Sequence, residues 1–309
     1  MTNYKNILVI KLGALGDWIH MTGFYSAIRH QWPKAKITLM TARSFFKMAQ
    51  KSGYFDEYIE DNRTWNPLDY MRIVKAMVSN HYDLIIDLQM QSRTKKRYYP
   101  LTRLFTKHAF CWAYPYQGSF WARYIAAKPR LLWGKEKFEK MDFKPESASL
   151  SFCKADPKVL VQLPSKYVLL IPGCSPAHPY KRWPAEFYRQ LALKLGKEKI
   201  YSVVLGTNAE KQEIDTICKG NSHAINFCNK SALLDIPEIA EKSLAIIGND
   251  TGPQHMAELG TTPAITLFSE ITASSRVIRN NVTNLLAKEI KDISVETVYQ
   301  TLQSLWHKA

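Results

Sequence analysis

The stretch ILVIKLGALGDWIH, residues 7–20, joins a short, continuous apolar run to a loop with two glycines and then to a segment of helical character. A continuous apolar run of this length is typical of a strand that is buried on both faces. Gly13 and Gly16 allow the tight turn that leads such a strand into a helix. The sequence therefore predicts a first strand–loop–helix unit, with its helix over about Asp17–Gln31.

The same alternation of apolar runs and helical segments recurs along the chain. Runs of this kind, separated by helices, indicate a parallel sheet with both faces covered, and two series of them predict two doubly wound α/β domains. The expected strands are Ile7–Ile10, Lys36–Met40 and Leu84–Leu88 in the first series, and Tyr167–Ile171, Ser202–Leu205, Leu244–Gly248 and Ala264–Leu267 in the second. Further helices are expected near Pro184–Gly196 and from about Glu210 and Gln254.

The link between the two domains is expected within residues 145–166. This stretch contains three prolines and several serines and has no sustained helical or strand period. We therefore expect an N-terminal domain over residues 1–155 and a C-terminal domain over residues 156–309. The apolar residues of Val295–Trp306 recur at helical spacing, which predicts a C-terminal helix.

The composition excludes several classes of protein. With 46% hydrophobic and 22% charged residues, the chain has the composition of a folded globular protein. No apolar run approaches the roughly 20 residues of a membrane helix, and the four-residue apolar core before Lys11 is too short for a secretory leader. The five cysteines include no C-x-x-C pair, and there is no D-x-D, H-E-x-x-H or Cys/His cluster. We therefore expect a reducing cytoplasm and no metal site.

The net charge of +15 is unevenly placed. Residues 1–150 hold 24 Lys and Arg against 12 Asp and Glu, whereas residues 151–309 hold 18 against 15. This asymmetry predicts an anionic partner for the N-terminal half, and a basic surface that merely aids solubility is the alternative.

Basic and aromatic side chains are mixed densely in residues 93–124. Docking to an anionic bilayer fits this segment better than nucleic-acid binding, because no known nucleic-acid motif is present. Internal packing of its aromatic residues is a third interpretation. The cations that we assign to the acceptor or the membrane are Arg93, Lys95, Lys96 and Arg97.

Three loops could carry chemistry, because ligands of open parallel sheets bind at the carboxyl ends of the strands. The first is KLGALGDW, residues 11–18, which has neither the dinucleotide fingerprint nor a Walker lysine. Asp17 is its candidate carboxylate, and an N-cap is the alternative role for that residue. His20 lies three residues further on and is more typical of a structural neighbour than of a catalyst.

The second loop is IPGCSPAHPYKRWP, residues 171–184, in which the adjacent cations Lys181 and Arg182 suit a diphosphate. The third is IIGNDTGPQHMAELG, residues 246–260, where a strand turns into a helix. Backbone N–H groups and the Thr251 hydroxyl there could hold phosphate oxygens, with a plain tight turn as the alternative.

Together, and in this order, the three loops resemble glycosyltransferase family 9, the lipopolysaccharide heptosyltransferases. The resemblance implies the GT-B fold, in which two Rossmann-like domains face a central cleft. The N-terminal domain would bind the acceptor, the C-terminal domain would bind the nucleotide sugar, and helix 295–306 would pack back on the N-terminal domain. The stretches that carry the resemblance are ILVIKLGALGDWIHMTGFYSAIRHQWPKAKITLMT, PGCSPAHPYKRWP and GNDTGPQHMAELGTTPAITLF.

The resemblance also implies roles for individual residues. Asp17 would be the general base, and Lys181 would approach the donor diphosphate. Glu210 would contact the ribose, with Glu213 as the rival assignment. The full set expected to bind the nucleotide sugar is Gly16, Ser175, Lys181, Glu210, Asp250, Thr251, Gly252 and His255.

The implied reaction is an inverting transfer of a heptose, or a related sugar, from an ADP-sugar to the inner core of lipopolysaccharide. No cofactor and no metal are expected, because Lys181 and helix N–H groups could stabilise the departing diphosphate. The implied partners are ADP-heptose, the lipopolysaccharide core and an anionic inner-membrane surface, with no nucleic acid. The implied location is cytoplasmic, at the inner face of the cytoplasmic membrane. Two alternatives stay open: a nucleotide-sugar epimerase of the same fold, and a non-catalytic basic protein that binds anionic lipid or nucleic acid.

Overall fold

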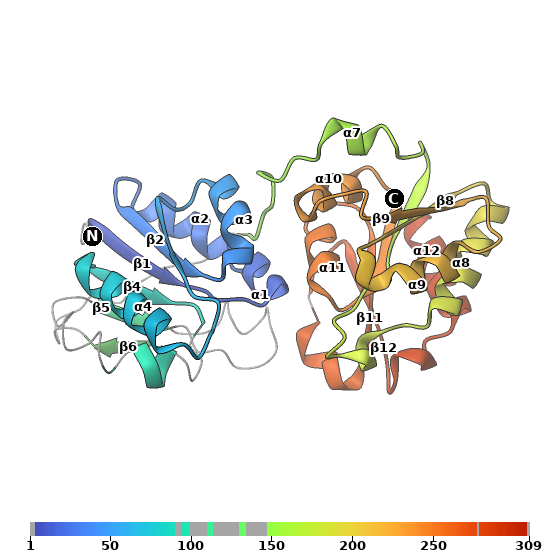
Figure 1. The fold of residues 1–309 in the computed structure, drawn as a ribbon. Coiled ribbons are helices and arrows are strands. Elements are labelled where there is room, and N and C mark those ends of the chain that lie inside the picture. Colours follow the sequence, from blue (N-terminus) through green and yellow to red (C-terminus); the bar gives the residue numbers. More distant parts are fainter. Residues whose placement is uncertain are drawn as a thin grey trace. The chain divides into compact units, whose positions relative to one another are not determined.

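The computed structural model describes residues 4–89, 94–98, 100, 110–113, 130–133, 147–276 and 278–307 of the 309-residue chain. The chain divides into two compact units at the junction between Phe152 and Cys153 (Figure 1). From the sequence we placed the domain boundary between residues 155 and 156. Each unit has its own sheet and its own core, and each is described by itself below.

The sheet of the first unit has the strand order β3-β2-β1-β4-β5-β6. Neighbouring strands are parallel except for β5 and β6, which are antiparallel. Ile10 at the end of β1 is paired with Asp87 at the end of β4, so the loops that follow these two central strands leave the sheet side by side. The bounds are β1 Asn6–Ile10, β2 Lys36–Thr41, β3 Glu57–Glu60, β4 Leu84–Asp87, β5 Phe110–Ala113 and β6 Arg130–Trp133.

The single helix predicted over Asp17–Gln31 is in fact two helices that meet at Met21. The Thr22 hydroxyl donates to the Ile19 carbonyl at 2.8 Å, which gives that carbonyl a side-chain partner at the break. The helices described in this unit are α1 Leu15–His20, α2 Thr22–Gln31, α3 Phe46–Ser52 and α4 Pro67–Ser79, with short helical turns at η1 Arg43–Phe45 and η2 Thr94–Tyr98.

The sheet of the second unit has the strand order β12-β11-β10-β7-β8-β9, and all its neighbouring strands are parallel. The strand order reverses between β7 and β10, where Ile171 is paired with Gly248. Open α/β sheets bind ligands outside the carboxyl ends of the strands at such a point. The bounds are β7 Tyr167–Ile171, β8 Tyr201–Gly206, β9 Ala224–Cys228, β10 Ala245–Asn249, β11 Ala264–Ser269 and β12 Val282–Ala287.

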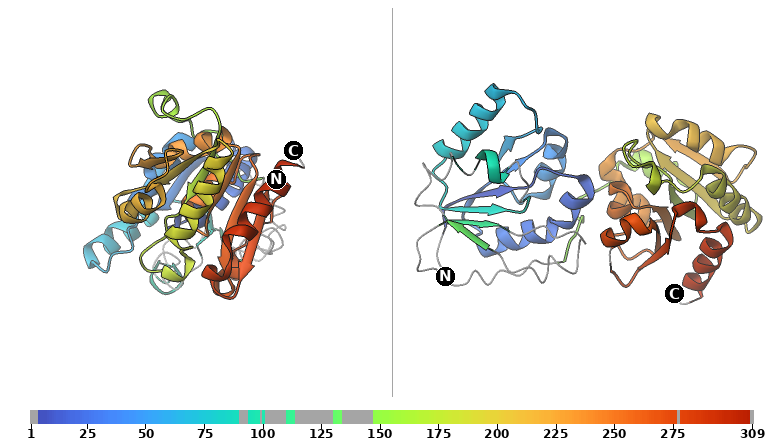
Figure 2. Two further views of the ribbon diagram at one scale, coloured as in Figure 1. Left: turned by 90° about the vertical axis from the view of Figure 1, so that its right-hand side faces the viewer. Right: turned by 90° about the horizontal axis from the view of Figure 1, so that it is seen from below.

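Helices cover this second sheet and bury its apolar strands (Figure 2). The α-helices are α7 Pro157–Leu160, α8 Ala185–Lys197, α9 Lys211–Cys218, α10 Ile236–Glu241, α11 Gly252–Ala257 and α12 Val295–Trp306. Short 3₁₀ turns are η3 Pro179–Lys181, η4 Asn208–Glu210, η5 Leu233–Asp235, η6 Glu270–Ser275 and η7 Ile290–Asp292. Among the described residues, no helix combines the length and the apolar character needed to cross a membrane.

The C-terminal helix α12 has the predicted bounds, and its apolar residues pack within the second unit. Val295, Val298 and Leu302 are buried in the core of the second unit, and Lys194 of α8 pairs with Glu296 of α12 at 2.9 Å. The apolar face of α12 thus covers the sheet of its own unit. The expectation that this helix also packs back on the N-terminal domain stays a prediction.

Candidate functional site

The loop after β1 carries a buried lysine next to the predicted carboxylate. The Lys11 side chain is 1% exposed, and its Nζ lies 3.8 Å from Asp17 Oδ2. The same Nζ donates to the Leu88 carbonyl at 3.4 Å, and Leu12 N donates to Gln89 Oε1 at 3.0 Å. These contacts fasten the β1 loop to the loop that follows β4.

Asp17 lies within the first turn of α1 and does not cap it. The helix begins at Leu15 with Ala14 as its N-cap residue, so the N-cap alternative is wrong. Gly16 precedes Asp17 in the same turn, and Gly13 has a φ of +129°, which other residues rarely adopt. A carboxylate at this end of a helix is favoured by the helix dipole. The Asp17 side chain keeps 25% of its surface exposed, whereas His20 is buried.

Lys11 is a site residue that the sequence interpretation missed. Burial lowers the pKa of its ammonium, and the nearby carboxylates of Asp17 and Asp87 act in the opposite direction. A lysine is rarely buried unless it is paired. The available signal was its position, because Lys11 directly follows a buried strand at the sheet edge where ligands bind.

In the second unit, the loops after β7 and β10 are joined by an ion pair. Lys181, in the turn η3, places its Nζ 2.5 Å from Asp250 Oδ2. The Lys181 side chain is 21% exposed and the Asp250 side chain is 3% exposed. The ammonium is therefore the accessible member of this pair.

Asp250 is held from several sides within the second unit. Its Oδ2 also accepts from Ser275 Oγ at 2.8 Å, and its Oδ1 lies 3.0 Å from His255 Nε2. The other ring nitrogen of His255 lies 2.7 Å from Glu258 Oε1, and Thr266 Oγ1 donates to Glu258 Oε2 at 2.8 Å. This buried chain of contacts ties the turn after β10 to β11.

Two pKa values in this chain depart strongly from their usual range. Burial alone would lower the pKa of His255, but the carboxylates of Glu258 and Asp250 on its two sides raise it to about 10. Burial alone would raise the pKa of Asp250, but the hydrogen bond and charge of His255, together with Lys181, lower it. The imidazolium of His255 and the carboxylate of Asp250 are thus held in their charged forms.

The Asp250–Gly252 turn also presents a hydroxyl. Thr251 is the N-cap residue of α11, yet its side chain makes no capping hydrogen bond. Its Oγ1 is buried and has no hydrogen-bond partner among the described residues. The hydroxyl can therefore serve a ligand without first losing a partner in the protein.

Glu210 and its rival Glu213 have different surroundings. Glu210 Oε2 accepts from Thr207 N at 2.9 Å, and its side chain lies so close to Gly173 that a Cβ there would meet its Cγ at 3.2 Å. Glu213 forms an ion pair with Arg182, whose other nitrogen donates to a loop carbonyl at 3.0 Å. Glu210 thus lies at the carboxyl ends of β7 and β8, while the charge of Glu213 is already neutralised.

Several of the residues predicted to bind the nucleotide sugar lie around the buried Cys174. Burial raises the pKa of its thiol, Arg182 and Lys181 lower it, and Asp250 and Glu210 raise it. These side chains are therefore within electrostatic reach of one point on the sheet edge. Ser175, the next residue, is exposed and accepts from Ala177 N at 3.4 Å.

The predicted cations for the acceptor or membrane are only partly described. Arg93 lies outside the described residues, as do the side chains of Lys95 and Arg97, whereas Lys96 is exposed. Their segment is held by Tyr98, which is buried and donates to Asp61 Oδ2 at 2.6 Å.

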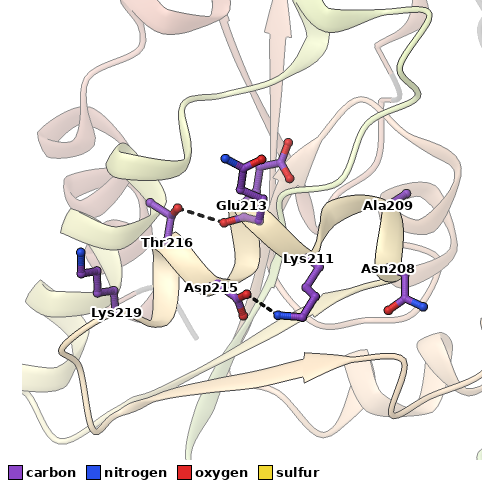
Figure 3. A pocket seen from close by; sticks show the side chains of 8 residues that line it. Asn208, Ala209, Lys211, Glu213, Asp215, Thr216 and Lys219 are labelled. Atoms are coloured by element: carbon purple, nitrogen blue, oxygen red, sulfur yellow. Dashed lines mark hydrogen bonds and ion pairs between the residues drawn. The ribbon is translucent and has the colours of Figure 1, made fainter.

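A hollow lies over α9 and η4, and Glu213 is one of the residues that line it (Figure 3). In it, Lys211 and Asp215 form an ion pair, and Thr216 Oγ1 donates to the Gln212 carbonyl at 2.9 Å. Its lining consists mostly of exposed polar side chains of one helix, so we do not assign it to the candidate site. Across the described residues, no group of three or more His, Cys, Asp and Glu could hold a metal ion. Metal independence therefore stays a prediction.

Comparisons with known proteins bear on the family and the fold of the chain. The model of glycosyltransferase family 9 (heptosyltransferase) matches residues 104–301. The chain is 20% identical over 301 residues to the lipopolysaccharide core heptosyltransferase OpsX of Haemophilus influenzae. The matched region covers 92% of this chain and 84% of the relative.

Two solved structures from E. coli share the fold. ADP-heptose lipopolysaccharide heptosyltransferase II has a TM-score of 0.70 and 17% identity, over 98% of this chain and 100% of that one. Heptosyltransferase WaaC with ADP-2-deoxy-2-fluoro heptose has a TM-score of 0.68 and 16% identity, over 97% and 99%. Together with the two parallel α/β units, these matches confirm the predicted GT-B fold class.

Proposed function

Because this chain belongs to glycosyltransferase family 9, the heptosyltransferases, and is a glycosyltransferase, we propose that it transfers a heptose from ADP-heptose to the inner core of lipopolysaccharide. Membership of this family decides against the epimerase and the non-catalytic binding protein that the sequence left open. The names of the relatives support the donor and the acceptor. One solved relative carries an ADP-heptose analogue, and the curated relative acts on the lipopolysaccharide core.

The observation that carries the proposal is the ion pair between Lys181 and Asp250. It holds a partly exposed ammonium at the carboxyl edge of β7 and β10, where a nucleotide diphosphate would bind. Charge-assisted contacts of this kind stabilise a leaving group that gains negative charge. The Thr251 hydroxyl, buried and without a partner in the described chain, supplies a further donor to phosphate oxygens.

We assign the role of general base to Asp17 of the first unit. Its carboxylate would accept the proton of the acceptor hydroxyl while the hydroxyl oxygen attacks the anomeric carbon of the donor. The bond from that carbon to the β-phosphate oxygen breaks, its electron pair leaves with ADP, and the configuration inverts. The exposed edge of Asp17 and its place in the first turn of α1 support this role.

The proposal includes no metal and a peripheral location at the inner face of the cytoplasmic membrane. Lys181 and the Thr251 hydroxyl would stabilise the diphosphate in place of a cation. The basic surplus of residues 1–150 supports contact with an acidic glycolipid and with the anionic bilayer that carries it.

The test of the proposal is nucleotide-dependent binding and transfer in EDTA. We expect ADP to raise the melting temperature more than UDP, GDP or CMP, and ADP-heptose to glycosylate a heptose-free inner-core acceptor. Loss of ADP binding on chelation would contradict the metal-free site. Transfer from another nucleotide sugar, with none from ADP-heptose, would overturn the assigned donor.

A further inference from the structure

The loop before α4 and the first turns of that helix expose three large apolar side chains. Trp65 is 81% exposed, Leu68 is 73% exposed and Met71 is 65% exposed. We name these three residues the α4 tip. Single exposed apolar residues are ordinary on protein surfaces, but a cluster of them marks a surface for interaction.

The tip lies on the outer face of an amphipathic helix. The inner face of α4 packs Ile73 and Met77 into the core of the first unit. Leu68 and Met71 are three residues apart, so they project from the same opposite face. Lys75 continues that face and is exposed as well, whereas the neighbouring Arg72 pairs with Asp69 of the same helix at 3.9 Å. The outer face therefore begins apolar and ends at an exposed cation.

The basic segment 94–98 is fastened to the same helix. The ring of Tyr98 stacks on Tyr70 of α4, with centroids 5.9 Å apart, and Tyr98 belongs to the core cluster that contains Ile73 and Met77. The exposed Lys96 belongs to this segment. The contacts of Tyr98 thus tie the helix that carries the apolar tip to a second basic segment of the sequence.

We propose that the α4 tip inserts into the boundary between headgroups and acyl chains of an anionic bilayer. This proposal rests on the proposed function, in which the acceptor is a membrane glycolipid. Trp65 has the amphipathic ring that favours this depth, while Leu68 and Met71 would bury apolar surface below it. The exposed cations Lys75 and Lys96 would lie at the level of the lipid phosphates.

Charge argues for a bilayer over a second copy of the chain. Pairing two such tips would bring like cations of both copies together, in a unit whose sequence already carries a surplus of positive charge. An anionic bilayer satisfies the apolar and the cationic side chains at once. The apolar part of the binding would persist at high salt, where the attraction of the cations is screened.

The experiment measures binding of the full chain to vesicles of phosphatidylcholine mixed with phosphatidylglycerol. The variant Trp65→Gln/Leu68→Gln/Met71→Gln changes exposed positions only, so its melting temperature is expected to match that of the parent. We expect its vesicle affinity to fall by about tenfold to 100-fold, with most of the loss remaining at high salt. Val161→Gln, which removes an 82% exposed apolar side chain in the second unit, is the matched control and is expected to bind like the parent.

Equal vesicle binding by the triple variant and the parent would overturn the proposal. Concentration-dependent dimers of the parent that disappear in the variant, with vesicle binding unchanged, would overturn it too and assign the tip to self-association. Transfer to a lipid-free core oligosaccharide tests the proposed function separately, because that acceptor needs no bilayer. We expect the triple variant to keep parental turnover there, whereas a parent that binds vesicles but transfers nothing would contradict the proposed function alone.

Discussion

Both units place a lysine and an aspartate at the carboxyl edge of their central strands, but they expose opposite members of the pair. In the first unit, Lys11 is 1% exposed and Asp17 is 25% exposed. In the second unit, Lys181 is 21% exposed and Asp250 is 3% exposed. The same two residue types thus present a carboxylate in one unit and an ammonium in the other.

This difference shows how a buried charge can define the function of its partner. A charge without a partner is expensive to bury, so each buried member depends on the ion pair and on further hydrogen bonds. Lys11 is held by a backbone carbonyl, whereas Asp250 is held by Ser275 and His255. The exposed carboxylate suits proton acceptance, and the exposed ammonium suits an anionic leaving group.

The largest effect is expected from removing the exposed member in the first unit. Asp17→Asn keeps the size of the side chain but removes the charge that accepts the proton. We expect kcat to fall by about 10²–10⁴-fold with nearly constant affinity for ADP, as measured by steady-state kinetics and calorimetry. The matched control is Glu296→Gln, which neutralises a first-turn carboxylate of α12 and is expected to keep parental turnover. Parental turnover in Asp17→Asn would remove Asp17 from the reaction, with His20 next to be tested.

Removing Lys181, the exposed member of the pair in the second unit, is expected to weaken the binding of the sugar donor. Lys181→Met keeps most of the side-chain length and removes the ammonium. We expect kcat/KM to fall by about 10²–10³-fold and the affinity for ADP to weaken with it, which separates this variant from Asp17→Asn. Lys194→Met, at an exposed lysine that pairs with Glu296, is the control. Unchanged ADP affinity in Lys181→Met would contradict the diphosphate site.

Removing the buried member in the first unit tests whether Lys11 supports Asp17. Lys11→Met places an apolar chain of similar length in a buried position, so the fold is expected to survive. Without the neighbouring ammonium the charged carboxylate is less favoured, and we expect the acidic limb of the pH–rate profile to move upward by about one pH unit. Lys51→Met, at an exposed position on α3, is expected to leave the profile in place. A change in kcat without movement of the acidic limb would show that Lys11 acts by packing alone.

The smallest effect on turnover is expected from changing His255, which contacts Asp250, the buried member of the pair in the second unit. The pKa of His255 is raised to about 10, because the carboxylates of Glu258 and Asp250 outweigh the effect of burial. Its contribution to stability is therefore complete below about pH 6.5 and is lost as the pH rises toward 10. We expect the free energy of unfolding to fall across that window by up to about 1.4 kcal/mol per pH unit in urea titrations.

The variant His255→Gln is expected to lose this part of the pH dependence. His30→Gln, at an exposed histidine of α2, is expected to retain it. The same slope in His255→Gln and in the parent would assign the pH dependence to other groups.

Most central strands of both sheets could be found from the sequence, but β5 and the edge strands could not. Tyr167–Ile171 was predicted with the bounds of β7, because every residue of a central parallel strand is buried and the apolar run is continuous. The edge strands β3, β9 and β12 were missed. Their residues are mostly half-buried, so no continuous apolar run marks them.

The sequence by itself determined the two doubly wound units, the three loops at their sheet edges and the family. Each of these depends on local patterns, namely apolar runs, glycines and short motifs within a few residues of one another. Only the tertiary structure decided that Lys11 is buried while Lys181 is partly exposed, and that the α4 tip faces solvent. The physical reason is that burial depends on which distant segments pack around a side chain. The sequence alone therefore does not show that Lys181 pairs with Asp250, which lies 69 residues away, nor which member of either pair the fold buries.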